Sequence, residues 1–320
     1  MNFQLLADNL TNPAFLFFAL GLLSVQLKSD LNIPQNSSKF ISLYLLFSIG
    51  FKGGQELAHS EFSQEIIWGI LFGLLIAAVI PVFSFYLLKR KLGIENAGAI
   101  AAAYGSVSAV TFVTAVGYLE NLHIHFSGYM VAVMAFMEAP AIIVGVLLVR
   151  LFSPLSSATG SLKGTIKHAV TNGSVILILG SLVIGTLTSD AEAEGIKPFT
   201  TDIFKGFLAI FLLDMGINSG KKIKDFLAYG WSTTAFAILM PLINGLWVSW
   251  FSQYITAETG DRFMFAVLAA SASYIAVPAA MKIAVPKANP GIFLPMALAI
   301  TFPFNITIGL PLYYWAVSVF

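Results

Sequence analysis

Glu138 is an acid near the middle of the apolar stretch 128–151. If that stretch crosses a bilayer, a central charge costs about 2.5–3.5 kcal/mol on insertion scales, so an acid there indicates a functional site or a buried pair. Pro140 follows two residues later and frees the carbonyl of residue 136 from the helical ladder. A carboxylate beside an unpaired carbonyl suits Na⁺ or a proton. The alternative is that Glu138 is hydrogen-bonded within a bundle and serves packing alone.

A second apolar stretch, 291–318, repeats this arrangement without the charge. It offers Thr301, Pro303 and Asn305 where the first stretch offers Glu138 and Pro140. One carboxylate that faces neutral oxygens attracts a monovalent cation without the excess charge that favours divalent ions. The predicted sodium ligands are Glu138, Thr301, Asn305 and Ser108.

Two runs of small polar residues, at 104–111 and 271–278, indicate a site for a small anion. If the helices break there, half-helix N-termini would direct backbone N–H groups and positive dipole ends at one point in the membrane. Close helix packing is the alternative, because membrane helices pack at Gly, Ala and Ser. The symmetric placement of the runs favours a site. The predicted anion-binding residues are Gly105, Ser106, Ser108, Thr111, Ser271, Ala272, Ser273 and Tyr274.

The composition requires that these residues be positioned by membrane helices. Hydrophobic residues make up 58% of the 320 residues and charged residues 10%, whereas globular chains carry about 25% charge. No cysteine is present, which excludes disulfides, thiol redox chemistry and Cys-ligated metal centres. No nucleic-acid partner and no cofactor is expected, apart from Na⁺ as a coupling ion.

Apolar windows between charge clusters predict ten transmembrane helices, with no room for a separate aqueous domain. They are 12–28, 38–56, 66–88, 97–118, 128–151, 171–189, 203–220, 228–252, 262–284 and 291–318. Asp8, with no Lys or Arg, precedes the first window, which predicts a retained span and not a cleaved signal.

The two halves of the sequence resemble one another in register. Segment 46–50 matches 212–216, Pro81 matches Pro241, 105–108 matches 270–273, and 138–140 matches 301–303, at offsets of 166, 160, 165 and 163. A duplicated five-helix unit enters the membrane the second time in the opposite orientation, and inverted repeats are the architecture of secondary transporters. The expected division is a first repeat at 1–151, a cytoplasmic linker at 152–170 and an inverted second repeat at 171–320. Chance similarity between apolar helices is the alternative.

The distribution of basic residues predicts the orientation. Loops after the first, third, fifth, seventh and ninth windows hold thirteen of the seventeen Lys and Arg residues. The positive-inside bias assigns these loops to the cytoplasm and both termini to the outside. Two further charges interrupt the second and seventh windows: Lys52 and Asp214 either pair across the repeat axis, or Lys52 extends to the interface. A structural role is favoured for both.

Three segments carry a resemblance to a known family. They are Phe211-Leu212-Leu213-Asp214-Met215-Gly216, the run from Leu268 to Ala280, and Thr301-Phe302-Pro303-Phe304-Asn305. With them, nearly the whole chain resembles the sodium-dependent bicarbonate transporter family, the SbtA-like permeases of bacteria. Family members generally carry Asp where this chain has Glu138.

The resemblance implies an elevator-type transporter of the bacterial inner membrane. Its mobile core would be windows three to five and eight to ten, and its scaffold windows one, two, six and seven. It also implies a homotrimer and, in some members, a small cytoplasmic regulator of the nitrogen-regulator type.

The expected function is inward symport of bicarbonate with Na⁺. Three alternatives stay open: a sodium- or proton-coupled permease for another small anion or carboxylate, a channel, and an intramembrane enzyme. An enzyme is disfavoured because the sequence has no His-Glu-x-x-His and no Gly-x-Ser-x-Gly motif.

Overall fold

Every regular element in the described part of the chain is a helix. The computed structural model describes residues 12–59, 63–153, 164, 167, 171–227 and 229–320, and these contain no strand. The prediction of an all-α protein is therefore confirmed. Of the predicted linker at 152–170, only residues 152, 153, 164 and 167 are described, so its role stays a prediction.

The helices fall on either side of that linker. Those before it are α2 (Pro13–Gln26), α3 (Gln35–His59), α4 (Gln64–Leu92), α5 (Ile94–Gly105), α6 (Ala109–Asn121) and α7 (Tyr129–Phe152). Those after it are α9 (Gly173–Leu187), α10 (Asp190–Lys197), η1 (Pro198–Asp202), α11 (Phe204–Leu227), α12 (Trp231–Phe251), η2 (Ser252–Tyr254), α13 (Thr259–Ala270), α14 (Ala276–Ala284), α15 (Pro290–Pro295), η3 (Met296–Thr301), α16 (Phe302–Phe304), η4 (Asn305–Gly309) and α17 (Leu310–Val319).

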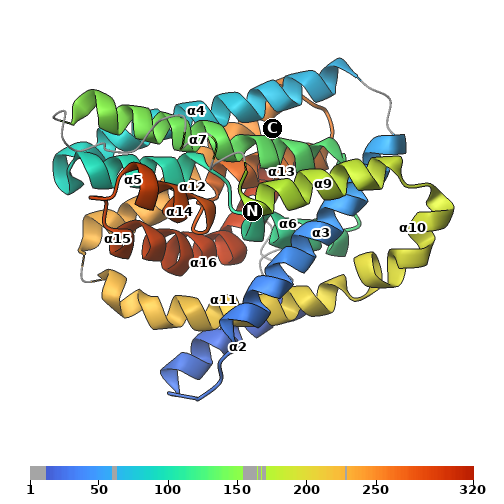
Figure 1. Ribbon diagram of the computed structural model, residues 1–320, viewed down its shortest axis with the longest axis horizontal. Coiled ribbons are helices and arrows are strands. Elements are labelled where there is room, and N and C mark those ends of the chain that lie inside the picture. The colour runs from blue at the N-terminus through green and yellow to red at the C-terminus, as the bar shows by residue number, and fades with distance from the viewer. Residues whose placement is uncertain (1–11, 60–62, 154–163, 165–166, 168–170, 228) are drawn as a thin grey trace.

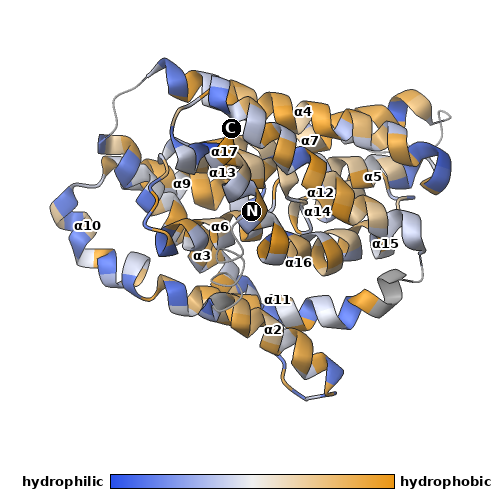
Figure 2. Cartoon of the chain, turned by 180° about the vertical axis from the view of Figure 1, so that it is seen from behind, coloured by the Kyte–Doolittle hydropathy of each residue, from blue (hydrophilic) through white to orange (hydrophobic). Residues whose placement is uncertain are grey.

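Six helical segments are long and apolar enough to cross a membrane. They are Gln64–Leu92, Ile94–Asn121, Tyr129–Phe152, Asp190–Ile223, Trp231–Tyr254 and Pro290–Val319, and Phe15–Gln26 and Gly173–Leu187 are shorter apolar helices. Figure 2 shows α4 and α7 as mainly hydrophobic and α10 as hydrophilic. An integral membrane protein is confirmed at this level. Each of the ten predicted windows coincides with a helix or with consecutive shorter helices.

The helices form two groups in space. Figure 1 shows α4 and α7 side by side along one edge, with α5 and the C-terminal helices beside them, and α11 crossed by α2 along the opposite edge. Between these edges, α3 packs along α9.

Two pairs of helices approach closely at glycines. In the pair α2 and α11, a Cβ on Gly216 would clash with the carbonyl oxygen of Phe18. In the pair α3 and α9, a Cβ on Gly50 would lie 2.8 Å from the carbonyl oxygen of Ile178. Gly50 and Gly216 are 166 residues apart, and Phe18 and Ile178 are 160 apart, as in the sequence repeat. Related segments therefore make the same contact twice, and both need a residue without a side chain.

Lys52 and Asp214 do not form the pair that was considered from the sequence. Lys52 Nζ lies 2.8 Å from Glu120 Oε1, and Ser38 Oγ donates to Asp214 Oδ2 at 2.5 Å. Ser38 and Lys52 are both on α3, about 21 Å apart at 1.5 Å per residue. Asp214 lies beside Ser38, so the pairing with Lys52 was wrong because the two charges lie at different depths.

Candidate functional site

The two polar runs interrupt their helices and meet each other. The first break separates α5 from α6, and the second separates α13 from α14. The backbone N–H of Ser108 donates to Ser271 Oγ at 2.9 Å, and the backbone N–H of Ser273 donates to the carbonyl oxygen of Ala103 at 2.8 Å. The breaks therefore cross at one place, as the sequence predicted from their matched positions.

A serine caps the second half-helix at each break. Ser108 Oγ accepts from the backbone N–H of Thr111 at 3.2 Å, at the start of α6. Ser273 Oγ accepts from the backbone N–H of Val277 at 3.4 Å, at the start of α14. A hydroxyl that accepts from the backbone keeps its own proton for donation. Both caps thus offer an O–H donor close to the positive end of a helix dipole.

A small cavity of about 20 Å³ lies at the crossing. Side chains of Ser108, Ser273 and Glu138 share its wall, as do Ser42 of α3 and Ser174 of α9. A cavity needs roughly 10–15 Å³ to hold one water. In this arrangement, the space suits a single small ion or one polar group.

Glu138 lies buried in this wall, with 6% of its surface exposed. Its Oε2 atom has no hydrogen-bond partner, and no ion pair with Glu138 occurs among the described residues. A buried carboxylate without a partner is strongly disfavoured unless a cation or a proton joins it. Glu138 therefore does not have the packing role that was the alternative from the sequence, insofar as that role requires an Oε2 hydrogen bond.

A vestibule of about 600 Å³ adjoins the small cavity. The two share Ser42, Ser174, Tyr274 and Ile275 in their walls. Three charged residues also line the vestibule, namely Lys39, Asp214 and Lys221. Both lysines belong to the loops predicted to be cytoplasmic, so the vestibule connects Glu138 with that side of the molecule.

The other predicted anion-binding residues surround the cavity without lining it. Gly105 ends α5, where a Cβ would clash with the ring of Pro81. The Ser106 hydroxyl is buried without a hydrogen-bond partner. Ser271 Oγ donates to the carbonyl oxygen of Leu268 at 2.9 Å, besides accepting from Ser108.

Thr111 and Ala272 also lie behind the cavity wall, and both are buried. Thr111 takes part through its backbone N–H, which Ser108 caps. Of the eight predicted residues, the structure thus brings Ser108, Ser273 and Tyr274 to the cavity wall.

Thr301 and Asn305 lie in the last helix, where π-helical segments η3 and η4 flank α16. Thr301 Oγ1 donates to the carbonyl oxygen of Ala237 at 2.7 Å and is 2.7 Å from the Tyr104 hydroxyl. Asn305 Nδ2 donates to the carbonyl oxygen of Ala270 at 2.8 Å. Neither lines the cavity beside Glu138, so their role as sodium ligands stays a prediction. π-helical segments are frequent at functional sites.

Sequence reasoning missed Ser42 and Ser174, because a single serine in an apolar helix is typical of packing. Their position in the cavity wall follows from how α3 and α9 pack on the broken helices. Asp214 was assigned a structural role, yet it lines the vestibule.

The family comparison covers nearly the whole chain. Residues 13–318 match the Na⁺-dependent bicarbonate transporter superfamily. The chain belongs to this family. Among curated proteins, none matches the chain.

Family membership confirms the resemblance found in the sequence. It supports Na⁺-dependent bicarbonate transport in general as the function, and a transporter in place of an enzyme. Bicarbonate and Na⁺ are the substrates that the family name supports.

Proposed function

We propose that this family member is an inward symporter of Na⁺ and bicarbonate that works by an elevator mechanism. One observation carries the proposal: the unpartnered carboxylate of Glu138 shares a small buried cavity with the capping serines of two half-helices, Ser108 and Ser273. The carboxylate supplies a cation site, and the caps with their helix dipoles supply an anion site.

The proposed architecture is ten spans arranged as two inverted five-helix repeats. Its support is the matched breaks in α5–α6 and α13–α14, together with the equivalent glycine contacts of α2 with α11 and of α3 with α9. The scaffold is α2, α3, α9 and α11, and the moving core is α4 to α7 with α12 to α17. The scaffold assembles as a homotrimer, and a small cytoplasmic regulator remains an expectation from the family resemblance.

Coupling follows from charge. A Na⁺ ion at Glu138 neutralises the repulsion between that carboxylate and a bicarbonate at the half-helix termini, so each ligand raises the affinity for the other by the same factor. A one-to-one symport moves no net charge, and each tenfold inward Na⁺ gradient then supplies about 1.4 kcal/mol. A hundredfold accumulation of bicarbonate needs a hundredfold gradient or more than one Na⁺.

The present arrangement is the inward-facing state in this scheme. The vestibule opens towards Lys39 and Lys221, which the positive-inside bias assigns to the cytoplasm. At a different depth, Lys52 of the scaffold pairs with Glu120 of the core at 2.8 Å and holds the two groups together. Both termini and the bacterial inner membrane follow the same orientation as proposals.

The test is bicarbonate uptake by liposomes that contain the purified protein. An imposed inward Na⁺ gradient is expected to drive accumulation in the wild type, and Glu138→Gln is expected to remove the dependence on Na⁺. Glu194→Gln is the matched control, since Glu194 is exposed and pairs only with Lys197 among the described ion pairs. Uptake that ignores the Na⁺ gradient would refute the coupling.

A proton-coupled carrier of a small anion is the second candidate, because a proton also satisfies an unpartnered buried carboxylate. In the same liposomes, uptake driven by an inward proton gradient without Na⁺ would favour this candidate. Competition by unlabelled carboxylates against labelled bicarbonate identifies the anion.

A further inference from the structure

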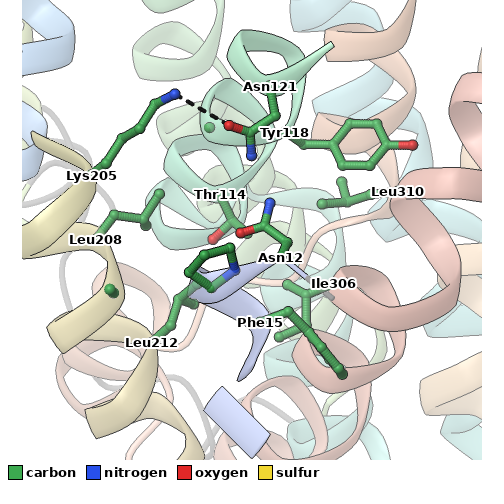
Figure 3. Close-up of a pocket in the computed structure, with 13 residues that line it drawn as sticks. Asn12, Phe15, Thr114, Tyr118, Asn121, Lys205, Leu208, Leu212, Ile306 and Leu310 are labelled. Atoms are coloured by element: carbon green, nitrogen blue, oxygen red, sulfur yellow. Dashed lines mark hydrogen bonds between the residues drawn. The ribbon is translucent and has the colours of Figure 1, made fainter. Parts of the chain in front are cut away.

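A separate cavity of about 150 Å³ lies between the proposed scaffold and the proposed core. Its walls come from α2 and α11 on one side and from α6, η4 and α17 on the other. Figure 3 shows its apolar part formed by Phe15, Leu208, Leu212, Ile306 and Leu310. None of these residues lines the vestibule or the cavity at Glu138.

One end of this cavity carries a positive charge. Lys205 Nζ donates to Asn121 Oδ1 at 3.2 Å, and both residues line the cavity at the end marked in Figure 3. Lys205 also lies 3.9 Å from Glu120 Oε2, while Lys52 holds Glu120 Oε1 at 2.8 Å. Two ammonium groups thus face one carboxylate, which leaves a net charge of plus one at the rim.

The cavity is related to the vestibule by the sequence repeat, with opposite polarity. At the offset of 166, Lys205 corresponds to Lys39 and Leu208 corresponds to Ser42. The lysine is kept at both places, but leucine replaces the serine that lines the path to Glu138. The vestibule therefore suits hydrated ions, whereas this cavity suits an apolar body attached to an anion.

We propose that this cavity binds a carboxylate amphiphile with an apolar body of about one aromatic ring. The carboxylate contacts Lys205, and the ring lies among Leu208, Leu212 and Ile306. The size fits, since a cavity of about 150 Å³ accepts benzene. A ligand here contacts both the core and the scaffold, so it stabilises their present arrangement and slows transport without competing with bicarbonate.

Direct binding tests the site independently of transport. The probe is 4-phenylbutyrate, added to the purified full-length protein without Na⁺ or bicarbonate, and binding is measured by calorimetry. The matched probes are 4-phenylbutanol, which lacks the charge, and butyrate, which lacks the ring. We expect 4-phenylbutyrate to bind about tenfold more tightly than 4-phenylbutanol, as for a hydrogen bond to a charged group, and butyrate not to bind measurably.

Two variants locate the ligand. Lys205→Gln is expected to weaken 4-phenylbutyrate about tenfold and to leave 4-phenylbutanol unchanged. Ala209→Leu, which adds carbon atoms to the wall, is expected to weaken both. Lys197→Gln is the control, because Lys197 is exposed and lies outside this cavity.

Three results would overturn the proposal. They are no binding of 4-phenylbutyrate to the full-length protein, an equal effect of Lys205→Gln on the charged and uncharged probes, and displacement of the probe by bicarbonate with Na⁺. Binding that occurs only after deletion of residues 1–11 would assign the cavity to that segment of the chain and would also overturn it. If binding holds but liposome uptake shows no Na⁺ dependence, the proposed symport fails and this site stands.

Discussion

The backbone N–H of Ser108 donates a 2.9 Å hydrogen bond to Ser271 Oγ, across 163 residues of sequence. This bond joins the break between α5 and α6 to the break between α13 and α14. Both residues are buried, so no water replaces the bond if it is lost. The crossing of the two breaks, and the cavity beside it, therefore depends on one serine hydroxyl.

Ser271→Ala is expected to destabilise the protein by about 1–3 kcal/mol, because it leaves a buried N–H without an acceptor. Thermal unfolding in detergent measures the change. Ser318→Ala is the control, since Ser318 lies exposed near the C-terminus and bonds only to the carbonyl oxygen of Tyr314. Equal midpoints for the two variants would show that the bond does not hold the breaks together.

Na⁺ is expected to stabilise the wild type against heat and not to stabilise Glu138→Gln. At a Na⁺ concentration of 100 times the dissociation constant, a ligand that binds only the folded state adds about 2.7 kcal/mol. The measurement compares unfolding midpoints in NaCl and in choline chloride at equal ionic strength. A Na⁺-dependent midpoint in Glu138→Gln would remove this carboxylate from the cation site.

Ser273→Ala is expected to raise the half-saturating bicarbonate concentration about tenfold, by loss of a donor to a charged ligand. Ser106→Ala is expected to leave it nearly unchanged, because the Ser106 hydroxyl does not line the cavity and has no hydrogen-bond partner. Initial rates of labelled bicarbonate uptake provide both values. If Ser106→Ala has the larger effect, the anion binds nearer the end of α5 than the cavity indicates.

Gly216→Ala is expected to destabilise the α2–α11 contact by about 1–3 kcal/mol, as overpacking of an interior does. The new Cβ would clash with the backbone carbonyl of Phe18, which cannot turn aside. Gly180→Ala is the matched control: Gly180 is also helical, but a Cβ there meets nothing within 4 Å. It is expected to stabilise by about 0.5–1 kcal/mol. Both are measured by thermal unfolding.

A cysteine at Ser42 tests which side the vestibule faces, and the natural chain has no cysteine to interfere. Ser42→Cys is expected to react with a membrane-impermeant thiol reagent in inside-out vesicles and to be protected by Na⁺ with bicarbonate. Glu194→Cys, in the predicted outer loop, is expected to react only in right-side-out vesicles. The reverse pattern would invert the proposed orientation.

The interrupted helices were predictable because their signals are local. Runs of Gly and Ser at 105–108 and 271–273 end helices wherever they occur, and the matched offsets indicated that the two breaks are related. The acid at position 138 was equally evident, since a charge within an apolar stretch is exceptional. Family membership and a helical membrane protein follow from such local patterns together with composition.

The partners of these residues were decided by tertiary structure alone. In a membrane chain, side chains that face lipid and side chains that face other helices are both apolar, so helical periodicity does not report which faces meet. For this reason the sequence did not place Ser42 and Ser174 in the cavity wall, or pair Lys52 with Glu120. The same ambiguity led Thr301 to be assigned to the cation, whereas in the structure its hydroxyl bonds to Ala237 and Tyr104.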